Sequence, residues 1–316
     1  MKNQTQNFIT SKPFIIAALV LLMLIPLSFI KDLVHDRQDY KNQAVKSISM
    51  PLGSAPKIEG LVIAMPYWEE IKNEKTVGGV KTIETTRIKR YLIVAPSQYD
   101  LDVQVSPYML NRGIFKVPAF NAGAKLNAAF TSVDLKQFSL EERAFIKDEC
   151  LLLLGMGNSK SLKSLPKIQV AGKTLSQSEV KFSGITPFTS TLYYILPENF
   201  FNSNFTLNSN LELQGTKYID IVPIAGENNF KMISSWATPG FSGSWLPNER
   251  TVTDYGFEAL WNIPGLSTNF SHAWNASENS TLFAATYEYS GFDNRNYSSE
   301  TWKLILTACA PSWLYR

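Results

Sequence analysis

The sequence predicts a mainly β protein, in which a β-rich, sandwich-like aqueous domain follows an N-terminal transmembrane helix and a juxtamembrane helix. Three observations predict this class. Residues 14–30 carry no charged side chain, which is typical of a membrane helix. From residue 58 onward, short apolar runs alternate with turn residues, as they do in strands. Aromatic residues make up 12% of the chain and charged residues 18%, a balance that suits strands around a large core.

Residues 14–30 form the predicted membrane anchor, and residues 1–13 are expected to be a short cytoplasmic N-terminus. The uncharged run is at the short end of the about 17 to 25 residues that span a bilayer as a helix. Lys12 and Lys31 flank it, and their long side chains can reach the two interfaces. No small residues in the spacing of a cleavage site follow the run, so we expect a retained anchor and not a signal peptide.

Residues 31–50 are predicted to continue the anchor as a juxtamembrane amphipathic helix, because apolar residues recur there at loose helical intervals between charges. The segment 51–57, with two prolines and a glycine, then ends the helical region. Lysine and arginine residues occur on both sides of the anchor. Since the positive-inside rule applies to short loops, this distribution leaves the side of the large domain open.

Residues 57–289 are predicted to form a single β-rich domain. Gly78 and Gly79 are expected to make a hairpin turn between its first two strands. One helix is expected over residues 140–149, capped by Ser139 and carrying acidic residues in its first turn. The strands are expected at residues 61–68, 82–96, 100–107, 113–118, 128–133, 151–157, 167–170, 190–196, 205–213 and 217–223.

The chain offers little material for catalysis or for a bound cofactor. His35 and His272 are its only histidines, and Cys150 and Cys309 lie far apart in the sequence with no metal-binding spacing. Residues 155–161, GMGNSKS, resemble a phosphate-binding loop, but the glycine required before the lysine is absent, so we expect a turn at the end of a strand. We therefore predict no catalytic, cofactor-binding or metal-binding residues.

Charged residues point to no nucleic-acid partner. The net charge is +3, and no cluster of lysine and arginine is dense enough to follow a phosphate backbone. A catalytic carboxylate pair could be drawn from five acidic residues, Glu69, Glu70, Glu74, Asp100 and Asp102. The sequence does not place them across a cleft. The alternative interpretation, which we favour, is that they cover solvated strand faces.

Residues 236–264 are crowded with tryptophan, glycine and proline. One interpretation, which we favour, is a loop and strand pair whose aromatic side chains complete the edge of the core. The other is an exposed, aromatic-rich docking surface for a partner protein or an envelope component. The candidate residues of this block are Trp236, Gly243, Trp245, Leu246, Pro247, Arg250, Gly256, Phe257 and Trp261.

Three blocks of the sequence resemble the CreD family of bacterial inner-membrane proteins. Residues 21–40, LLMLIPLSFIKDLVHDRQDY, are similar to the anchor and juxtamembrane signature of that family. Residues 60–67 resemble its next block, and residues 240–261 its later G-x-x-LP-x-x-R and GF-x-A-x-W block. The three blocks occur in the order of the family and together extend over most of the chain.

The chain departs from the family pattern in two places. Asn158 and Lys160 stand where the family usually has an aspartate and an arginine two residues apart, so an ion pair there is not reproduced. Family members also continue into several C-terminal transmembrane helices. The apolar run WKLILTACA, residues 302–310, is too short to cross a bilayer as a helix. We therefore expect residues 290–316 to be a truncated or divergent tail, with the membrane bundle of the family missing.

The resemblance implies an inner-membrane protein whose large domain is periplasmic. It also implies a role in cell envelope integrity, stress response and colicin tolerance. The family has no established enzymatic activity, so we expect action through interactions, with the lipid bilayer and an envelope or membrane protein as partners and without a cofactor. Two alternatives stay open: a regulatory or structural subunit of a membrane assembly, and a carboxylate-based enzyme acting on envelope polymers.

Overall fold

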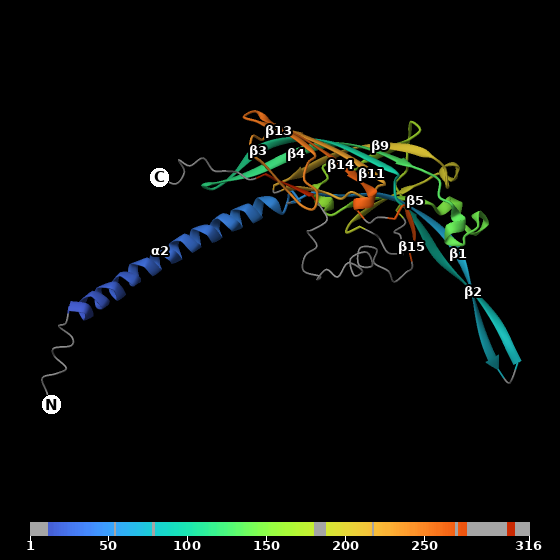
Figure 1. The fold of residues 1–316 in the computed structure, drawn as a ribbon, viewed down its shortest axis with the longest axis horizontal. Helices are drawn as coiled ribbons and strands as arrows, with labels where there is room; N and C mark the ends of the chain where they lie inside the picture. The colour runs from blue at the N-terminus through green and yellow to red at the C-terminus, as the bar shows by residue number, and fades with distance from the viewer. Residues whose placement is uncertain are drawn as a thin grey trace. The chain divides into compact units, whose positions relative to one another are not determined.

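The chain divides into two compact units, which are described separately. One contains Met1–Ile48 and Asn111–Val117, and the other Ser49–Leu110 and Pro118–Arg316. The computed structural model (Figure 1) describes residues 12–53, 55–77, 80–179, 188–216, 218–268, 271–276 and 302–306.

The first unit contains one long helix, α2 (Lys12–Ser49), of 38 residues. The predicted anchor and juxtamembrane helices are therefore one continuous helix, and Pro26 lies inside it. From residue 16 to residue 43, every side chain whose exposure is described is exposed, including Leu21 at 67% and Phe29 at 68%. Among the described residues, no helix reaches the length and hydropathy needed to cross a bilayer.

Sheet A is the first of two eight-stranded sheets that the described residues form. Its strands are β1 (Lys57–Val77), β2 (Val80–Val94), β5 (Leu151–Met156), β8 (Thr191–Ile195), β10 (Tyr218–Ile221), β12 (Pro239–Ser242), β15 (Ala273–Ala276) and β16 (Trp302–Leu306). Their order is β12-β16-β10-β1-β2-β15, and β5 pairs with β1 and β8. β1 is the central strand, since it is antiparallel to β2 and β5 and parallel to β10.

Sheet B is the second sheet. Its strands are β3 (Gln98–Arg112), β4 (Phe115–Phe130), β6 (Lys167–Val170), β7 (Lys173–Thr174), β9 (Phe205–Gly215), β11 (Glu227–Ser234), β13 (Glu249–Thr253) and β14 (Gly256–Pro264). Their order is β13-β14-β11-β3-β4-β9-β6-β7. The pairing of β11 with β3 is parallel and joins segments more than 100 residues apart in the sequence.

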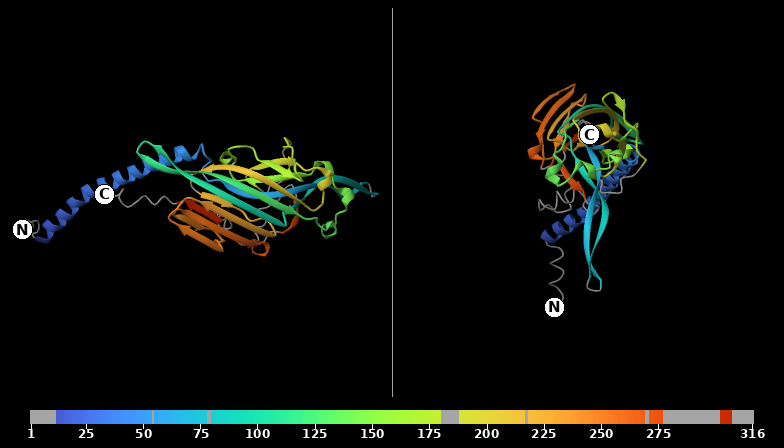
Figure 2. Two further views of the ribbon diagram at one scale, coloured as in Figure 1. Left: turned by 90° about the horizontal axis from the view of Figure 1, so that it is seen from above. Right: turned by 90° about the vertical axis from the view of Figure 1, so that its right-hand side faces the viewer.

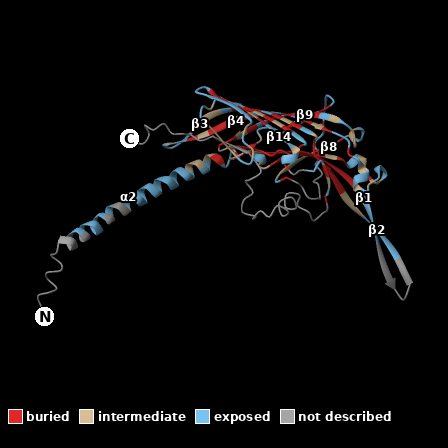
Figure 3. Cartoon of the chain, in the orientation of Figure 1, coloured by how far each residue is buried: buried red, intermediate tan, exposed pale blue. Residues whose placement is uncertain are grey.

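The core lies between the two sheets. β3, β9 and β11 alternate between buried and exposed residues (Figure 3), so that each presents one apolar face inward. Sheet A also buries its other face, where Val62, Ile93 and Leu153 form a second apolar cluster. β5 is consequently apolar on both sides, which explains its unbroken LLLL run. The prediction of a mainly β protein is confirmed.

The distal part of β1 and β2 is a two-stranded ribbon that projects from the rest of the sandwich (Figures 1 and 2). Two ion pairs of 2.8 Å link its strands, Arg90 with Glu69 and Arg87 with Glu70. The register pairs Val77 with Val80, as the predicted hairpin requires. Gly78 and Gly79, the predicted turn residues, lie outside the described residues.

The helix predicted over residues 140–149 is wrong. The described chain forms short 3-10 helices there and elsewhere, at Leu135–Phe138, Glu142–Ala144, Lys147–Glu149, Ser159–Ser161, Glu198–Phe200 and Gly265–Ser267. Ile146 N–H donates to the carbonyl of Pro66 in β1 at 2.8 Å, and Phe145 packs against the ring of Tyr67. These tertiary contacts take the backbone out of helical geometry, so they outweigh the local helix signal.

The predicted strands overlap observed ones, and several extend past them by one or two residues. Two differences are larger. Residues 113–118 and 128–133 were expected to be separate strands, whereas residues 115–118 and 128–130 both belong to the single strand β4. Residues 302–306 of the expected tail form β16, which pairs with β10 and β12. A brief apolar run too short for a membrane helix thus has the length of an ordinary strand.

Gly155 and Gly123 provide a matched test of the core. A Cβ atom at Gly155 would lie 2.3 Å from the ring of buried Phe188, whereas one at Gly123, on the outer face of β4, meets no atom within 4 Å. We expect Gly155→Ala to lower the free energy of unfolding by about 1–3 kcal/mol through overpacking. Gly123→Ala should leave it unchanged or raise it by less than about 1 kcal/mol. Thermal denaturation of both variants checks this, and equal melting temperatures would contradict the packing.

Candidate binding face on the outer side of sheet B

The aromatic residues of the block 236–264 are mainly turned into the sandwich. Phe257 and Trp261 of β14 are 3% and 2% exposed. Phe241 of β12, in the other sheet, contacts both edge-to-face, with ring centroids 5.6 Å from Phe257 and 5.7 Å from Trp261. Such pairs add to the stabilisation that burial alone provides. The three rings therefore join sheet A to sheet B at this edge of the core.

Gly256 begins β14 and allows the hairpin with β13 to form. Its φ is +144°, and a Cβ atom there would lie 2.1 Å from the carbonyl oxygen of Ser234. Any side chain would push β14 away from β11. Thr253 Oγ1 closes the same turn by donating to the carbonyl of Gly256 at 3.1 Å. The hairpin thus has its own local support as well as the buried rings behind it.

The other candidate residues of the block lie nearer the surface. Trp236, Trp245 and Pro247 are half-buried, whereas Gly243, Leu246 and Arg250 are exposed. Tyr255, in the turn before β14, is the one aromatic residue of the block that is largely exposed, at 90%. This burial pattern favours the packing interpretation of the block over an aromatic docking surface.

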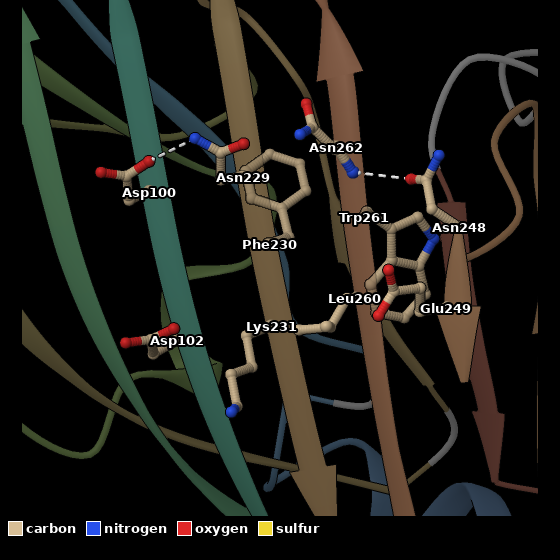
Figure 4. Close-up of a pocket in the computed structure, with 10 residues that line it drawn as sticks. All are labelled: Asp100, Asp102, Asn229, Phe230, Lys231, Asn248, Glu249, Leu260, Trp261 and Asn262. Carbon is tan, nitrogen blue, oxygen red and sulfur yellow. Dashed lines mark hydrogen bonds between the residues drawn. The ribbon is translucent and has the colours of Figure 1, made fainter. Parts of the chain in front are cut away.

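The outer face of sheet B carries a hollow of about 390 Å³ beside this block (Figure 4). It crosses β3, β11, β14 and the start of β13. It is lined by Asp100, Asp102, Asn229, Phe230, Lys231, Asn248, Glu249, Leu260, Trp261 and Asn262. Five of these residues belong to the block 236–264, and the other five belong to β3 and β11. The hollow thus lies on the outer side of β14, whose inner side carries the aromatic contact with Phe241.

Asp100 is held in position by its neighbours on the sheet. Asn229 Nδ2 donates to Asp100 Oδ1 at 2.8 Å, as Figure 4 shows. Gln98 Nε2 lies 3.1 Å from Asp100 Oδ1 and 2.9 Å from Oδ2, so it donates to the same carboxylate. A carboxylate oxygen can accept more than one hydrogen bond. Asp100 is therefore oriented and retains capacity to accept further donors from the hollow.

The opposite wall is fixed by Asn248. Its Oδ1 accepts a hydrogen bond of 2.7 Å from the backbone N–H of Asn262, and its own N–H donates to the carbonyl of Leu260 at 2.8 Å. Because Asn248 directly precedes β13, these bonds extend the pairing of β13 and β14 beyond the first residue of β13. Lys231 Nζ lies 2.6 Å from Glu258 Oε1, and this hydrogen bond raises the pKa of the lysine. The lysine charge is therefore largely balanced by a carboxylate.

The structure separates the carboxylates that the sequence offered as a catalytic set. Asp100 and Asp102 lie on the same face of β3 and line the hollow with Glu249. Glu69 and Glu70 lie on the β1–β2 ribbon, paired with arginines. The side chain of Glu74 lies outside the described part of that ribbon. The five carboxylates therefore do not form one site.

Two other groups that could act in catalysis are poorly placed for it. Burial raises the pKa of the Cys150 thiol to about 12, and the Asp148 and Glu149 carboxylates add to the effect. The thiol consequently stays protonated near neutral pH. Burial also lowers the pKa of His272. The described residues contain no cluster of three or more His, Cys, Asp or Glu that could hold a metal ion, and Cys309 lies outside them.

The residues 155–161 form a turn and not a phosphate cradle. β5 ends at Met156, and Asn158 Oδ1 accepts the N–H of Lys160 at 3.1 Å. Asn158 Nδ2 donates to the carbonyl of Gly53 at 2.7 Å. A carboxylate has no proton to donate there at neutral pH. The asparagine therefore ties this turn to the segment that precedes β1.

Sequence reasoning missed Asn229, Lys231, Asn248 and Asn262. A usable signal exists for β11, where ENNFKMIS alternates and so predicts Asn229 and Lys231 on one outer face. Their approach to Asp100 and Asp102 depends on the parallel pairing of β11 with β3, and no local pattern reveals that pairing.

Comparison with known proteins identifies one family. The family model described as "Inner membrane protein CreD" matches residues 8–293. Inner membrane protein CreD of Escherichia coli (strain K12) is 24% identical over 265 residues, which are 83% of this chain and 56% of that protein. The chain thus spans about half the length of this curated relative. A crystal structure of a two-domain M1 zinc metallopeptidase bound to L-arginine aligns with a TM-score of only 0.27 and 10% identity, over 55% of this chain and 40% of that one.

Trp261 and Tyr255 test whether the block stabilises the domain. Trp261→Ala removes a ring that is 2% exposed, and we expect it to lower the free energy of unfolding by about 3–5 kcal/mol. Tyr255→Ala removes a ring that is 90% exposed, and we expect a change within about 0.5 kcal/mol. Chemical denaturation of the two variants measures the difference. A Trp261→Ala protein as stable as the parent would refute the packing interpretation.

Proposed function

The chain belongs to the CreD family of inner membrane proteins, and on that premise we propose that it is an anchored envelope protein that acts by interaction. Helix α2 is its anchor and the β sandwich is its working part. The sandwich lies on the periplasmic side of the inner membrane. Its task is to support cell envelope integrity and stress tolerance, including tolerance of colicins.

The observation that carries this proposal is the exposed apolar surface of α2. The described side chains of residues 16–30 include eight large apolar groups that are more than half exposed, among them Leu22 and Met23. A helix that is apolar around its circumference needs an apolar environment. The same segment is the uncharged run between Lys12 and Lys31. Because the family consists of inner membrane proteins, the lipid bilayer is the apolar environment that we propose for this surface.

Action by interaction is supported by the chemistry of the hollow on sheet B. Its carboxylate Asp100 accepts hydrogen bonds from two amides, and its lysine is paired with Glu258. Amide and carboxylate side chains held in this way offer fixed donors and acceptors to a ligand. They do not form the activated nucleophile and base that covalent catalysis requires.

A second candidate function is favoured by the β1–β2 ribbon. Isolated two-stranded ribbons are only marginally stable in water, and the distal part of this one is held by surface ion pairs. Trp68 and Ile83 on it are 45% and 60% exposed. These features fit contact with another protein, so the domain would be a regulatory or structural subunit of a membrane assembly.

Topology tests the proposal as a whole. Cells expressing the full chain are converted to spheroplasts and treated with protease, and their membranes are extracted with carbonate. We expect digestion of the sandwich without lysis, while α2 stays in the membrane pellet. Protection of the sandwich until lysis would contradict the periplasmic placement, and release of the intact chain by carbonate would contradict the anchor.

Leu22 and Leu33 give a matched test of the anchor. Both are exposed leucines on α2, at 66% and 69%, but only Leu22 lies within the uncharged run. Arginine at the centre of a membrane helix costs about 2.5–3.5 kcal/mol on the insertion scale. We expect Leu22→Arg to increase the carbonate-extractable fraction of the protein, and Leu33→Arg to leave it unchanged. Equal extraction of the two variants would place the membrane boundary elsewhere.

A further inference from the structure

Amide and carboxylate side chains form two sets on the outer face of sheet B, and each set lies at right angles to the strands it crosses. The register places Asn262 beside Asn229 and Asn229 beside Asp100, across β14, β11 and β3. On the other half of the sheet it places Asn127 of β4 beside Asn208 of β9, and Asn208 beside Gln169 of β6. β3 and β4 are neighbours in the sheet, so the two sets lie on adjacent halves of the same face. These six residues are called the amide row: Asn262, Asn229, Asp100, Asn127, Asn208 and Gln169.

The amide row lowers the stability of the sheet. Asparagine and aspartate are depleted in strands, whereas threonine and other β-branched residues are favoured there. A face that met only water would be better covered by threonine. Five of the six members are asparagine or aspartate, and they occupy five different strands. Local conflicts of this kind are expected at functional sites.

The amide row also has unused hydrogen-bonding capacity. Asn127, Asn208 and Gln169 are exposed, and within the described part of the chain none of them bonds to another side chain. Each primary amide presents two donor hydrogens and one acceptor oxygen. At the other end, Asn229 and Asp100 are bound to each other and border the hollow. One half of the row is therefore free to bind along the face, and the other half is preorganised beside a recess.

The direction of the row limits the class of ligand. Neighbouring strands are about 4.8 Å apart, so the row extends about 24 Å across six strands. A peptide that adds to a sheet pairs along the edge of a strand, whereas this row runs across strands. The ligand that fits it is an extended polymer with a hydrogen-bonding group at short, regular intervals.

The charges of the face narrow the class further. Asp100, Asp102 and Glu249 line the hollow, and Lys231 is balanced by Glu258, so an anionic sugar would be repelled from the hollow. Lys125 and Lys167 are exposed beside the other half of the row, where they flank Asn210, so this repulsion is confined to the hollow. Hydroxyl and acetamido groups, which both donate and accept, match primary amides. A hollow of about 390 Å³ is within the range of small-molecule sites and has room for one sugar ring against Leu260.

We propose that the outer face of sheet B binds a neutral glycan strand, which lies across the strands along the amide row with one sugar unit in the hollow. This inference rests on the proposed function, because a glycan of the envelope meets the sandwich only on the periplasmic side. The amides bind successive hydroxyl and acetamido groups. Asp100, oriented by Gln98 and Asn229, accepts hydrogen bonds from the sugar in the hollow.

Calorimetric titration of the purified full chain tests the proposal. The probe is chitohexaose, a neutral linear hexamer of N-acetylglucosamine, and the detergent must have no sugar headgroup, since such a headgroup would compete. The test variant is Asn127→Thr with Asn208→Thr, which removes two amides and introduces a residue that strands favour. The control variant is Asn199→Thr, an exposed asparagine in the 3-10 helix Glu198–Phe200, outside both sheets.

We expect the parent and the Asn199→Thr protein to bind chitohexaose with equal affinity. The double variant should bind at least about tenfold more weakly, as the loss of two hydrogen bonds implies, while its melting temperature is unchanged or higher. Absence of binding by the parent at millimolar chitohexaose would overturn the proposal, as would full affinity in the double variant. Neither failure affects the topology measured in spheroplasts, so the proposed function is tested separately.

Discussion

The alternation of side chains along the strands of sheet B is the constraint on which the rest of the structure depends. Successive residues of a strand point to opposite faces, so a shift of one residue would exchange the whole inner set for the outer set. In β14, Trp261 is buried against Phe241 of the other sheet, and this contact fixes the register. Leu260 and Asn262 are then forced outward, where they line the hollow. The core and the candidate binding face are therefore two consequences of one register.

The sequence predicts the strands well where this alternation is strong. In β9, the residues TLNSNLELQ alternate over nearly the whole strand, and the expected range falls inside the observed one. The helix expected at residues 140–149 fails because its stabilising partners are distant in the sequence, with Ile146 bonded to Pro66. Local helix signals are weak compared with tertiary contacts of this kind.

The candidate site could be predicted only in part, for a related reason. The block around Trp261 is recognisable from its composition, and the glycine at 256 is explained by its close approach to Ser234. The amide row is not recognisable in the same way, since its members come from six strands. Their placement on one face follows from the strand pairings, which include the parallel pairing of β3 with β11. Long-range pairing of that kind leaves no periodic signal in the sequence.

We propose that the two units supply different parts of one function. The apolar surface of α2 requires an apolar environment, whereas the outer face of sheet B is built from amides and carboxylates that require polar partners. Membership in the CreD family connects the first requirement to the inner membrane. On the proposed function, the polar, preorganised face would hold an envelope component while α2 holds the chain in the membrane.

The central claim is that the outer face of sheet B is exposed on the periplasmic side, and the accessibility of two adjacent residues on β9 tests it most directly. In a chain with Cys309→Ser and the buried Cys150 retained, Asn208→Cys and Leu207→Cys are made separately and treated in spheroplasts with a membrane-impermeant maleimide. Asn208 is exposed and Leu207 is 2% exposed. The account requires labelling at position 208 without lysis and little at position 207. Labelling at 208 only after lysis, or equal labelling at both positions, would contradict it.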